Sequence, residues 1–200
     1  AHPNDPEQAA ALVYHWRKAE NFSKERHYAR IAGTYAQQQF LHDAALNHFD
    51  RALALTDPAD LLEQFELHLA CEQTYHLLGR RDEQKTTLAT LSNIAQQLAQ
   101  QQNLEKRGEV ALRLANYAEA TGDYPTSLAA ANEALRVAQE GNDKQIETAS
   151  YLAAGRTLVR QGKYESAQLY FQKSLAAARS HNFPHLEADS LRLLGVMMYD

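Results

Sequence analysis

The chain has 200 residues and a formal net charge of −5, from 20 basic and 25 acidic side chains interspersed along the sequence. This interspersed charge excludes the basic surface that nucleic-acid binding requires. The single Cys excludes an internal disulfide and fits a reducing compartment, so we expect a cytoplasmic protein. No apolar run reaches the length of a membrane span, and we therefore expect no membrane partner.

Good helix formers dominate the composition, with only eight Gly and five Pro, so we predict an all-α fold. The first half of the chain predicts a lead-in at Ala1–Pro6 and helices at Glu7–Glu20, Lys24–Gln39, Ala44–Leu55, Leu61–Leu78 and Asp82–Gln101. Ser23 is the expected N-cap of the second helix, because its hydroxyl can accept a backbone N–H. Pro58 ends the third helix, since Pro cannot continue the hydrogen-bond ladder.

The second half of the chain predicts five more helices after a turn near Asn103. They cover Glu105–Thr121, Tyr124–Glu140, Lys144–Gln161, Tyr164–Ser180 and His185–Asp200. Pro125 lies in a first helical turn, where its missing N–H costs nothing. Gly141 ends one helix, and Asp143 can cap the next.

Small or turn residues recur along the sequence at steps near 40 residues. They are Gly79, Gly122 and Gly162 at the corners, and Gly33, Ala115, Gly155 and Gly195 inside the first helix of each pair. A period of this length with two helices per unit predicts a solenoid, because one hairpin cannot bury both of its apolar stripes alone. We expect the small residues to let helices approach closely, and Phe171 and Tyr164 to fill the gaps. A closed helical bundle without true repeats is the alternative.

We therefore predict an α-α superhelix of antiparallel hairpins. A lead-in helix occupies residues 1–22, and the array occupies residues 23–200. Its units are 24–56, 61–102, 104–141, 144–181 and a truncated unit, 185–200. The last helix has no partner, so we expect Met197, Met198 and Tyr199 to contact residues beyond the sequence.

The order of residues in each pair resembles the tetratricopeptide repeat family, over Lys24 to Asp200. The best match is Gly155, Gly162, Tyr164, Ala167, Phe171, Ser174 and Leu175, followed by Ala115, Gly122, Tyr124, Ser127, Ala131, Ala134 and Leu135. Gly33, Ala45, Phe49, Ala52 and Leu53 match in the first unit, although Phe40 stands where the corner Gly belongs. The unit around Leu61–Leu98 fits worst, since Glu72 replaces a small residue. The resemblance implies a right-handed superhelix that binds a protein or peptide.

A second resemblance lies at the start of the chain. His15, Trp16, Ala19 and Glu20 are similar to a helix that leads into the tetratricopeptide array of large bacterial signal-transduction (STAND-type) ATPases and transcriptional regulators. This likeness implies an excised sensor segment. The other domains of the parent protein are then expected partners, and the absence of an initial Met agrees with this interpretation.

No residue pattern predicts catalysis, a metal site or a cofactor. The nine His form no set of four ligands. Cys71 lies on an apolar stripe, so we expect a buried and inert thiol. The Glu residues of the helices are expected on solvated faces; they are Glu63, Glu66, Glu72, Glu83, Glu105, Glu109 and Glu119.

The concave face of the array is the candidate binding groove, because the first helices line it. The predicted groove residues are Arg30, Gln73, His76, Asn116, Glu119, Arg156, Arg160, Asp189 and Arg192, with His27, Thr34 and Gln37 beside Arg30. Arg156 and Arg160 form a like-charge pair one turn apart, which needs an acidic partner. Glu119 or Asp189 of a neighbouring unit, or an acidic ligand, can supply it.

These observations predict a non-catalytic scaffold for protein–protein interaction, as the sensing or regulatory arm of a larger bacterial signalling protein. The alternative is a receptor for a small-molecule inducer. An apolar pocket with convergent Arg156, Asn116 and Glu119 would favour the receptor, whereas a flat, wet groove would favour the scaffold.

Overall fold

The computed structural model describes residues 6–100 and 104–197, and every regular element in these two ranges is helical. The predicted all-α fold is confirmed. A 3₁₀ turn, η1 (Pro6–Gln8), precedes α1 (Ala9–Lys18), α2 (Phe22–Gln38), α3 (His42–Ala54), α4 (Leu61–Leu78), α5 (Arg81–Gln100), α6 (Leu104–Ala120), α7 (Tyr124–Glu140), α8 (Lys144–Arg160), α9 (Tyr164–His181) and α10 (Pro184–Met197). The lead-in before Pro6, the turn near Asn103 and the contacts expected of Met198 and Tyr199 lie outside the described residues.

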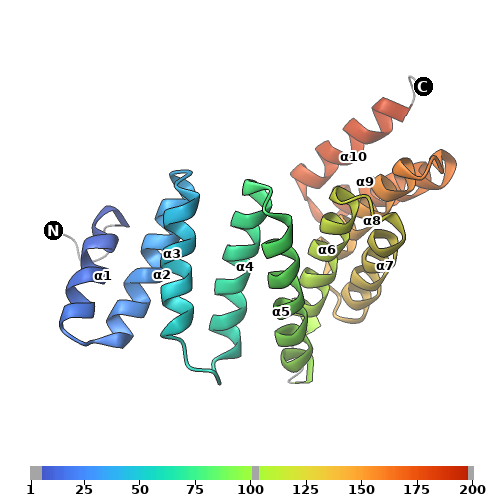
Figure 1. Cartoon of the computed structure of the whole chain (residues 1–200). Helices are drawn as coiled ribbons and strands as arrows, with labels where there is room; N and C mark the ends of the chain where they lie inside the picture. The colour runs from blue at the N-terminus through green and yellow to red at the C-terminus, as the bar shows by residue number, and fades with distance from the viewer. Residues whose placement is uncertain (1–5, 101–103, 198–200) are drawn as a thin grey trace. The chain divides into compact units, whose positions relative to one another are not determined.

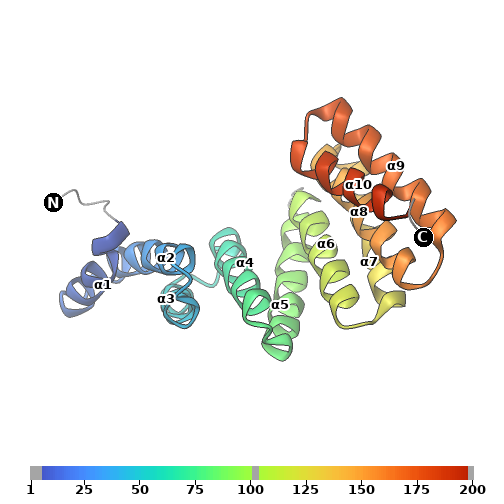
Figure 2. The ribbon, with the colours of Figure 1, turned by 90° about the horizontal axis from the view of Figure 1, so that it is seen from above.

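The chain divides into two units, Ala1–Ile94 and Ala95–Asp200, and α5 runs through the division. In the first unit α1, α2 and α3 each pack against the next helix, and α2 also contacts α4 (Figure 1). In the second unit α6 to α10 pack in the same consecutive order. There α6 also contacts α8, and α8 contacts α10 (Figure 2). Each unit is thus a stack of helical hairpins and not a closed bundle, as predicted.

The corners of the hairpins share one backbone geometry, which explains the recurring glycines. Phe40, Gly79, Gly122 and Gly162 have left-handed φ angles of 60°, 68°, 81° and 72°. At each corner the next amide bonds back to a carbonyl five residues earlier, as Asp123 N does to Ala118 O over 2.8 Å. Glycine adopts this conformation without strain, whereas Phe40 pays a steric cost for it.

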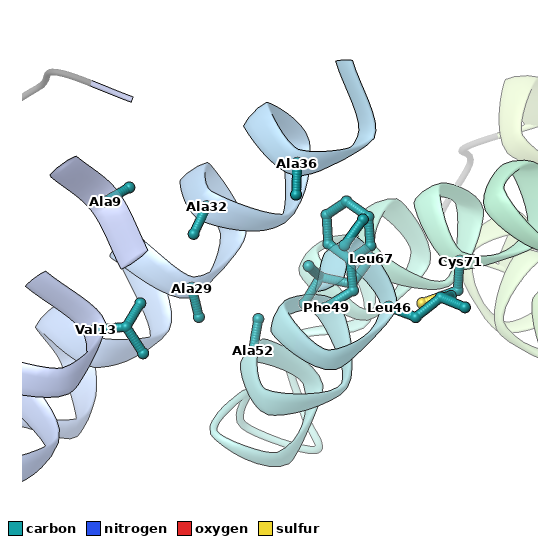
Figure 3. Packing of buried hydrophobic residues seen from close by; sticks show 11 residues of the cluster. Ala9, Val13, Ala29, Ala32, Ala36, Leu46, Phe49, Ala52, Leu67 and Cys71 are labelled. Carbon is teal, nitrogen blue, oxygen red and sulfur yellow. The ribbon is translucent and has the colours of Figure 1, made fainter. Parts of the chain in front are cut away.

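The core of the first unit is a cluster of small side chains around one aromatic ring. Ala29 and Ala32 on α2 lie in this cluster with Ala52 on α3 (Figure 3). Ala45 on α3 belongs to the same cluster, and all four side chains are nearly or fully buried. Phe49 lies at the centre with 1% of its surface exposed. A methyl group on Gly33 would lie 2.6 Å from Cδ1 of this ring. The predicted close approach at Gly33 is therefore confirmed.

In the second unit, one hairpin has the same contact between a glycine and a Phe ring, and another hairpin has a pair of alanines in its place. A methyl group on Gly155 would lie 2.6 Å from Cδ1 of Phe171, as at Gly33. In the preceding hairpin Ala115 takes the place of the glycine and Ala131 that of the ring, and both are buried in one cluster. A bulkier residue on the first helix therefore faces a smaller residue on the second.

A buried ion cluster in the first unit was not predicted from the sequence. Glu25 on α2 is fully buried and accepts hydrogen bonds from Arg17 on α1 (2.7 Å) and Arg51 on α3 (2.7 and 2.9 Å). The hydrogen bonds from Arg51 hold the pKa of Glu25 below its usual value, against the opposing effect of burial, and Arg17 adds to the lowering. One carboxylate thus joins the first three helices.

Three expectations about single residues were wrong. The N-cap of α2 is Asn21, whose side chain accepts from Lys24 N over 3.1 Å, because the helix begins one residue before Ser23. Tyr164 is 57% exposed and fills no gap between hairpins. Glu72 is buried, because Gln84 on the partner helix donates to its carboxylate over 2.6 Å. This polar pair occupies the place that small residues hold elsewhere.

Candidate functional site

A groove crosses the first helices of the three hairpin positions in the second unit. Its volume is about 550 Å³, and α6, α8 and α10 supply its walls. The lining residues are Glu105, Glu109, Leu112, Arg113 and Asn116 from α6, Asp143, Gln145, Ile146 and Ala149 at the start of α8, and His185 and Leu186 from α10. The groove therefore lies on first helices, which the sequence predicted to line a binding face.

The period of the repeat places these residues side by side. Glu105, Gln145 and His185 stand 40 residues apart from one to the next, and each lies near the start of its first helix. Ile146 and Leu186 are also 40 residues apart. Stacked repeats present equivalent positions on one face, so residues 40 positions apart lie next to one another in the groove lining.

The groove combines an apolar floor with charged walls. Leu112, Ile146 and Leu186 are half-buried and leave apolar surface open to a ligand. Arg113 lies on α6 with a guanidinium nitrogen 3.5 Å from Glu109. Asp143 is held in place as the N-cap of α8, where it accepts from two backbone amides. Such a surface can bury apolar side chains and hydrogen-bond a peptide backbone.

Of the predicted groove residues in this unit, Asn116 lines the groove and the others lie beyond its end. Arg156 donates to Glu119 over 3.0 Å and to Asn116 over 2.5 Å. Arg160 also reaches Glu119, at 3.5 Å, with 62% of its side chain exposed. The acidic partner of the two arginines is thus Glu119, which is only 14% exposed and does not lie on a solvated face as expected.

The last two predicted groove residues of this unit belong to a different local pair. Asp189 lies 3.5 Å from Arg192 on the same helix, α10, and both side chains are at least half exposed. The predicted pairing of Asp189 with the arginines of α8 is therefore replaced by a pair within one helix.

In the first unit, polar contacts join the first helices α2 and α4. Arg30 donates to Glu63 over 2.9 Å, and Gln37 donates to Thr74 over 2.9 Å. His76 on α4 lies 3.2 Å from Arg81 at the start of α5, while Gln73 is exposed. The predicted residues here mainly connect neighbouring repeats.

The groups considered for chemistry have surroundings that suppress reactivity. Cys71 is 3% exposed, and burial raises the pKa of its thiol to about 12 with a smaller contribution from the charge of Asp50. Burial also lowers the pKa of His48 and of His68. Within residues 6–100 and 104–197, no three side chains of His, Cys, Asp or Glu gather as metal ligands would.

The helices of the described ranges also bear on membrane association. Across residues 6–100 and 104–197, no helix combines the length and the apolar character that a membrane crossing requires.

The repeat geometry agrees with a family assignment. The family model described as the tetratricopeptide repeat matches residues 107–180, which contain most of α6 to α9. This part of the chain belongs to the tetratricopeptide repeat family. Tetratricopeptide repeats are scaffolds for protein–protein interaction and are generally non-catalytic. A comparison with curated protein sequences gives no match.

Solved structures with the same fold extend this likeness along the chain. BtubC (BKLC) from P. vanneervenii has a TM-score of 0.78 at 15% identity, over 96% of this chain and 81% of that protein. A STAND signal-transduction ATPase with a tetratricopeptide repeat sensor, from Pyrococcus horikoshii, has a TM-score of 0.72 at 16% identity, over 97% of this chain and 28% of that one. A Rap protein complexed with Competence and Sporulation Factor has a TM-score of 0.70 at 18% identity, over 87% and 48%.

These similarities show a shared fold. The chain spans about half the length of the Rap protein and little more than a quarter of the STAND ATPase.

The sequence predicted a groove on the first helices, and of the residues it named in this unit Asn116 is the one that lines the groove of α6, α8 and α10. The predicted stripe followed the second half of each first helix, whereas the open space lies along the first half of α6, α8 and α10. The signal that could have identified the lining is the 40-residue step itself. Applied to Glu105, it leads directly to Gln145 and His185.

Proposed function

We propose that this chain is a non-catalytic scaffold whose groove, formed by α6, α8 and α10, holds an extended segment of a partner protein. The groove carries this proposal, because its volume of about 550 Å³ continues across three successive first helices. A segment lying across them can place apolar side chains on the floor while polar groups meet the walls. The Rap protein, which shares this fold, is described in complex with a factor, and this precedent agrees with the proposal.

Blocking the groove tests this function. Ala149 is half-buried in the wall, so Ala149→Trp fills the groove without replacing a core residue. Leu169→Trp is the matched control, because Leu169 is 61% exposed on α9 and does not line the groove. Peptides are selected from a random display library on the wild-type chain and measured by calorimetry. We expect Ala149→Trp to weaken their binding at least tenfold and Leu169→Trp to leave it unchanged.

Two results would contradict the groove as the binding site. The first is a selection that yields no peptide with saturable binding. The second is a set of peptides that bind the Ala149→Trp variant as well as the wild type, with both variants retaining the helix content of the parent chain.

A receptor for a small-molecule inducer is the second candidate. The observation in its favour is the convergence of Arg156, Asn116 and Glu119, because a ligand carboxylate could replace Glu119 at Arg156. The three groups are, however, already bonded to one another, and the open groove runs away from them along the first halves of the helices. Ligands that depend on Arg156 and ignore Ala149→Trp would favour the receptor over the scaffold.

We also propose that the chain is the sensing or regulatory arm of a larger cytoplasmic bacterial signalling protein. The STAND ATPase supports this, since its structural similarity covers 97% of this chain and 28% of that protein, and that protein carries a tetratricopeptide repeat sensor. His15 and Trp16 lie on α1, the helix of the second sequence resemblance. Binding of the chain to the ATPase core of its parent protein tests the proposal, and no association at high micromolar concentration would contradict it.

A further inference from the structure

A smaller pocket opens beside the groove, at the open end of the hairpin formed by α6 and α7. Its volume is about 260 Å³, and α6, α7 and the start of α8 supply its walls. We call it the side pocket, and its lining residues are Leu104, Glu105, Gly108, Val137, Ala138, Gly141, Asp143 and Ile146. The groove shares Glu105, Asp143 and Ile146 with it, so the two spaces lie next to each other.

The side pocket is lined mainly by aliphatic side chains and offers space for one more. Val137 and Ala138 on α7 are nearly fully buried. Leu104 and Ile146 are half-buried and add aliphatic surface. A closed apolar cavity of about 150 Å³ is large enough to bind benzene. The side pocket therefore has room for a bulky apolar side chain of another molecule.

Gly108 keeps the side pocket open, although the packing of the helices does not require a glycine there. It lies in the interior of α6 and is buried. A methyl group built on it would lie 3.4 Å from Cγ2 of Ile146 and 3.6 Å from Cγ1 of Val137, which is ordinary contact. At Gly155, by contrast, the same methyl group would lie 2.6 Å from the Phe171 ring. Alanine would stabilise α6 at this position, so the glycine gives up stability where it leaves a pocket open.

The next hairpin has larger residues at the equivalent positions. The 40-residue step leads from Gly108 to Thr148 and from Gly141 to His181. Thr148 is fully buried, and the ring centre of His181 lies 6.0 Å from that of Phe183. The small residues that leave the side pocket open therefore belong to the hairpin of α6 and α7 and are not a general property of the repeat.

Glu105 places a negative charge where the side pocket meets the groove. It is exposed in the first turn of α6. The neighbouring carboxylates are already engaged, because Asp143 caps α8 and Glu109 lies 3.5 Å from Arg113 and 3.6 Å from Lys106. Within the described part of the chain, Glu105 has no ion-pair partner. A cationic group of a bound molecule can therefore pair with it without displacing a cation of the chain.

We propose that the side pocket receives one bulky apolar side chain of the partner segment, and that a lysine or arginine two positions away in the same segment pairs with Glu105. This inference rests on the proposed function, because it names the chemistry of the segment held in the groove. In an extended chain, residues two positions apart lie on the same side and about 6–7 Å apart. Glu105 and Gly108 are three positions apart on one face of α6, where neighbouring Cβ positions are about 5–6 Å apart. The two spacings match.

The first part of the test uses the peptides that are selected on the wild-type chain from the random display library. We expect a bulky apolar residue with lysine or arginine two positions away to recur in their sequences. Replacing the apolar residue by alanine should weaken binding at least tenfold in calorimetry, because a few buried anchors supply most of the affinity. Replacing the basic residue by alanine should weaken binding by about two- to fivefold, the effect of one exposed ion pair, and by less at high salt.

The second part of the test fills the side pocket in the 200-residue chain. The methyl group of Gly108→Ala would touch Ile146 and Val137 at ordinary distances, so the fold is kept while the space between these two walls closes. Gly195→Ala is the matched control, because Gly195 is also a glycine inside a first helix and lines neither the side pocket nor the groove. We expect Gly108→Ala to weaken binding of the selected peptides at least tenfold and Gly195→Ala to leave it unchanged.

The third part of the test removes the charge of Glu105. Glu105→Gln should weaken binding by about two- to fivefold, and this loss should vanish for peptides whose basic residue is replaced by alanine. Glu165→Gln is the matched control, because Glu165 is exposed in the first turn of α9 and lines neither space. We expect this control to bind the peptides as the wild type does.

The results separate this inference from the proposed function. Peptides that lose binding with Ala149→Trp but bind Gly108→Ala as well as the wild type would overturn the role of the side pocket and leave the groove as the binding site. Peptides without a recurrent basic residue, together with unchanged binding to Glu105→Gln, would overturn the pairing with Glu105 in the same way. Failure to select any peptide, or peptides indifferent to Ala149→Trp, would overturn the groove and the side pocket together.

Discussion

The substitution of alanine at two equivalent glycines is predicted to change stability in opposite directions. In a free helix, Gly→Ala stabilises by about 1 kcal/mol, because alanine loses less backbone entropy on folding. At Gly195 nothing opposes this gain, since the new methyl group has no neighbour within 4 Å. We therefore expect Gly195→Ala to raise the free energy of unfolding by about 0.5–1 kcal/mol.

At Gly155 the same methyl group would lie 2.6 Å from Cδ1 and 3.1 Å from Cζ of Phe171, whereas unstrained carbon atoms stay about 3.5–4 Å apart. The ring is fully buried and cannot move by about 1 Å without displacing α8 or α9. Overpacking of this kind costs about 1–3 kcal/mol. A contact of 2.6 Å places the cost in the upper part of this range, at about 2–3 kcal/mol. After subtraction of the helix gain of about 1 kcal/mol, we expect Gly155→Ala to lower the free energy of unfolding by about 1–2 kcal/mol.

A double-mutant cycle isolates the contact between the glycine and the ring. In the Phe171→Ala background, Gly155→Ala reproduces the alanine pair of Ala115 and Ala131, so it becomes stabilising by up to about 1 kcal/mol. Urea denaturation followed by far-ultraviolet circular dichroism measures each variant. The reasoning is refuted if Gly155→Ala is as stable as the wild type, or if its effect is the same with and without the Phe171 ring.

The remaining predictions concern a buried charge, a buried thiol and a strained corner. Glu25→Gln should lower the free energy of unfolding by about 2 kcal/mol at neutral pH. This loss is smaller than the loss expected on breaking a fully buried ion pair, because the side chain of Arg17 is 53% exposed. Folding lowers the pKa of Glu25, so the stabilisation from its charge is fully present above its pKa in the unfolded chain, near 4.5, and is lost as the pH falls through its pKa in the folded chain. Measuring the free energy of unfolding at decreasing pH should show this loss in the wild type and not in Glu25→Gln. Cys71, with its pKa near 12 and 3% exposure, should resist thiol reagents at pH 8 until urea unfolds the chain, and rapid native labelling would contradict its burial. Phe40→Gly should raise the free energy of unfolding by about 1 kcal/mol, because glycine relieves the strain of the left-handed φ at this corner. Phe40→Ala keeps a Cβ and should give no such gain. Equal effects of the two substitutions in urea denaturation would argue against strain at this corner.

The limits of the helices were predictable where one residue decides them. The bounds of α4 and α7 were predicted as observed, because Asp60 and Asp123 accept the first amides of these helices and Gly79 and Gly122 turn the chain at the corners. These are local interactions, and the sequence contains both partners within a few positions.

The burial of charges could not be predicted, because it depends on residues from several helices. Glu25 looks like a surface residue near the start of α2, and only the arrival of Arg17 from α1 and Arg51 from α3 makes its burial favourable. Glu72 is similar, since its partner Gln84 comes from the next helix. A periodic pattern identifies a helix face but does not show which charges meet there.

The candidate groove likewise has features that the sequence predicted and features that depend on packing between helices. Periodicity predicted a groove on the first helices, and Asn116 is the predicted residue that lines the groove of α6, α8 and α10. The position of the open space along those helices depends on how the long side chains fold over one another. Arg156 and Arg160 close the predicted end by bonding to Glu119, while the smaller Ala149 leaves the other end open.

The short reach of the polar contacts has a consequence for synthesis on the ribosome. The most widely separated hydrogen bond described above joins Arg156 to Asn116, 40 residues apart, and Arg30 and Glu63 are 33 apart. At about 5–20 residues per second, a nascent chain supplies 40 residues in about 2–8 s. Each emerging hairpin can therefore find its partners soon after it leaves the exit tunnel, while the rest of the polypeptide is still being made.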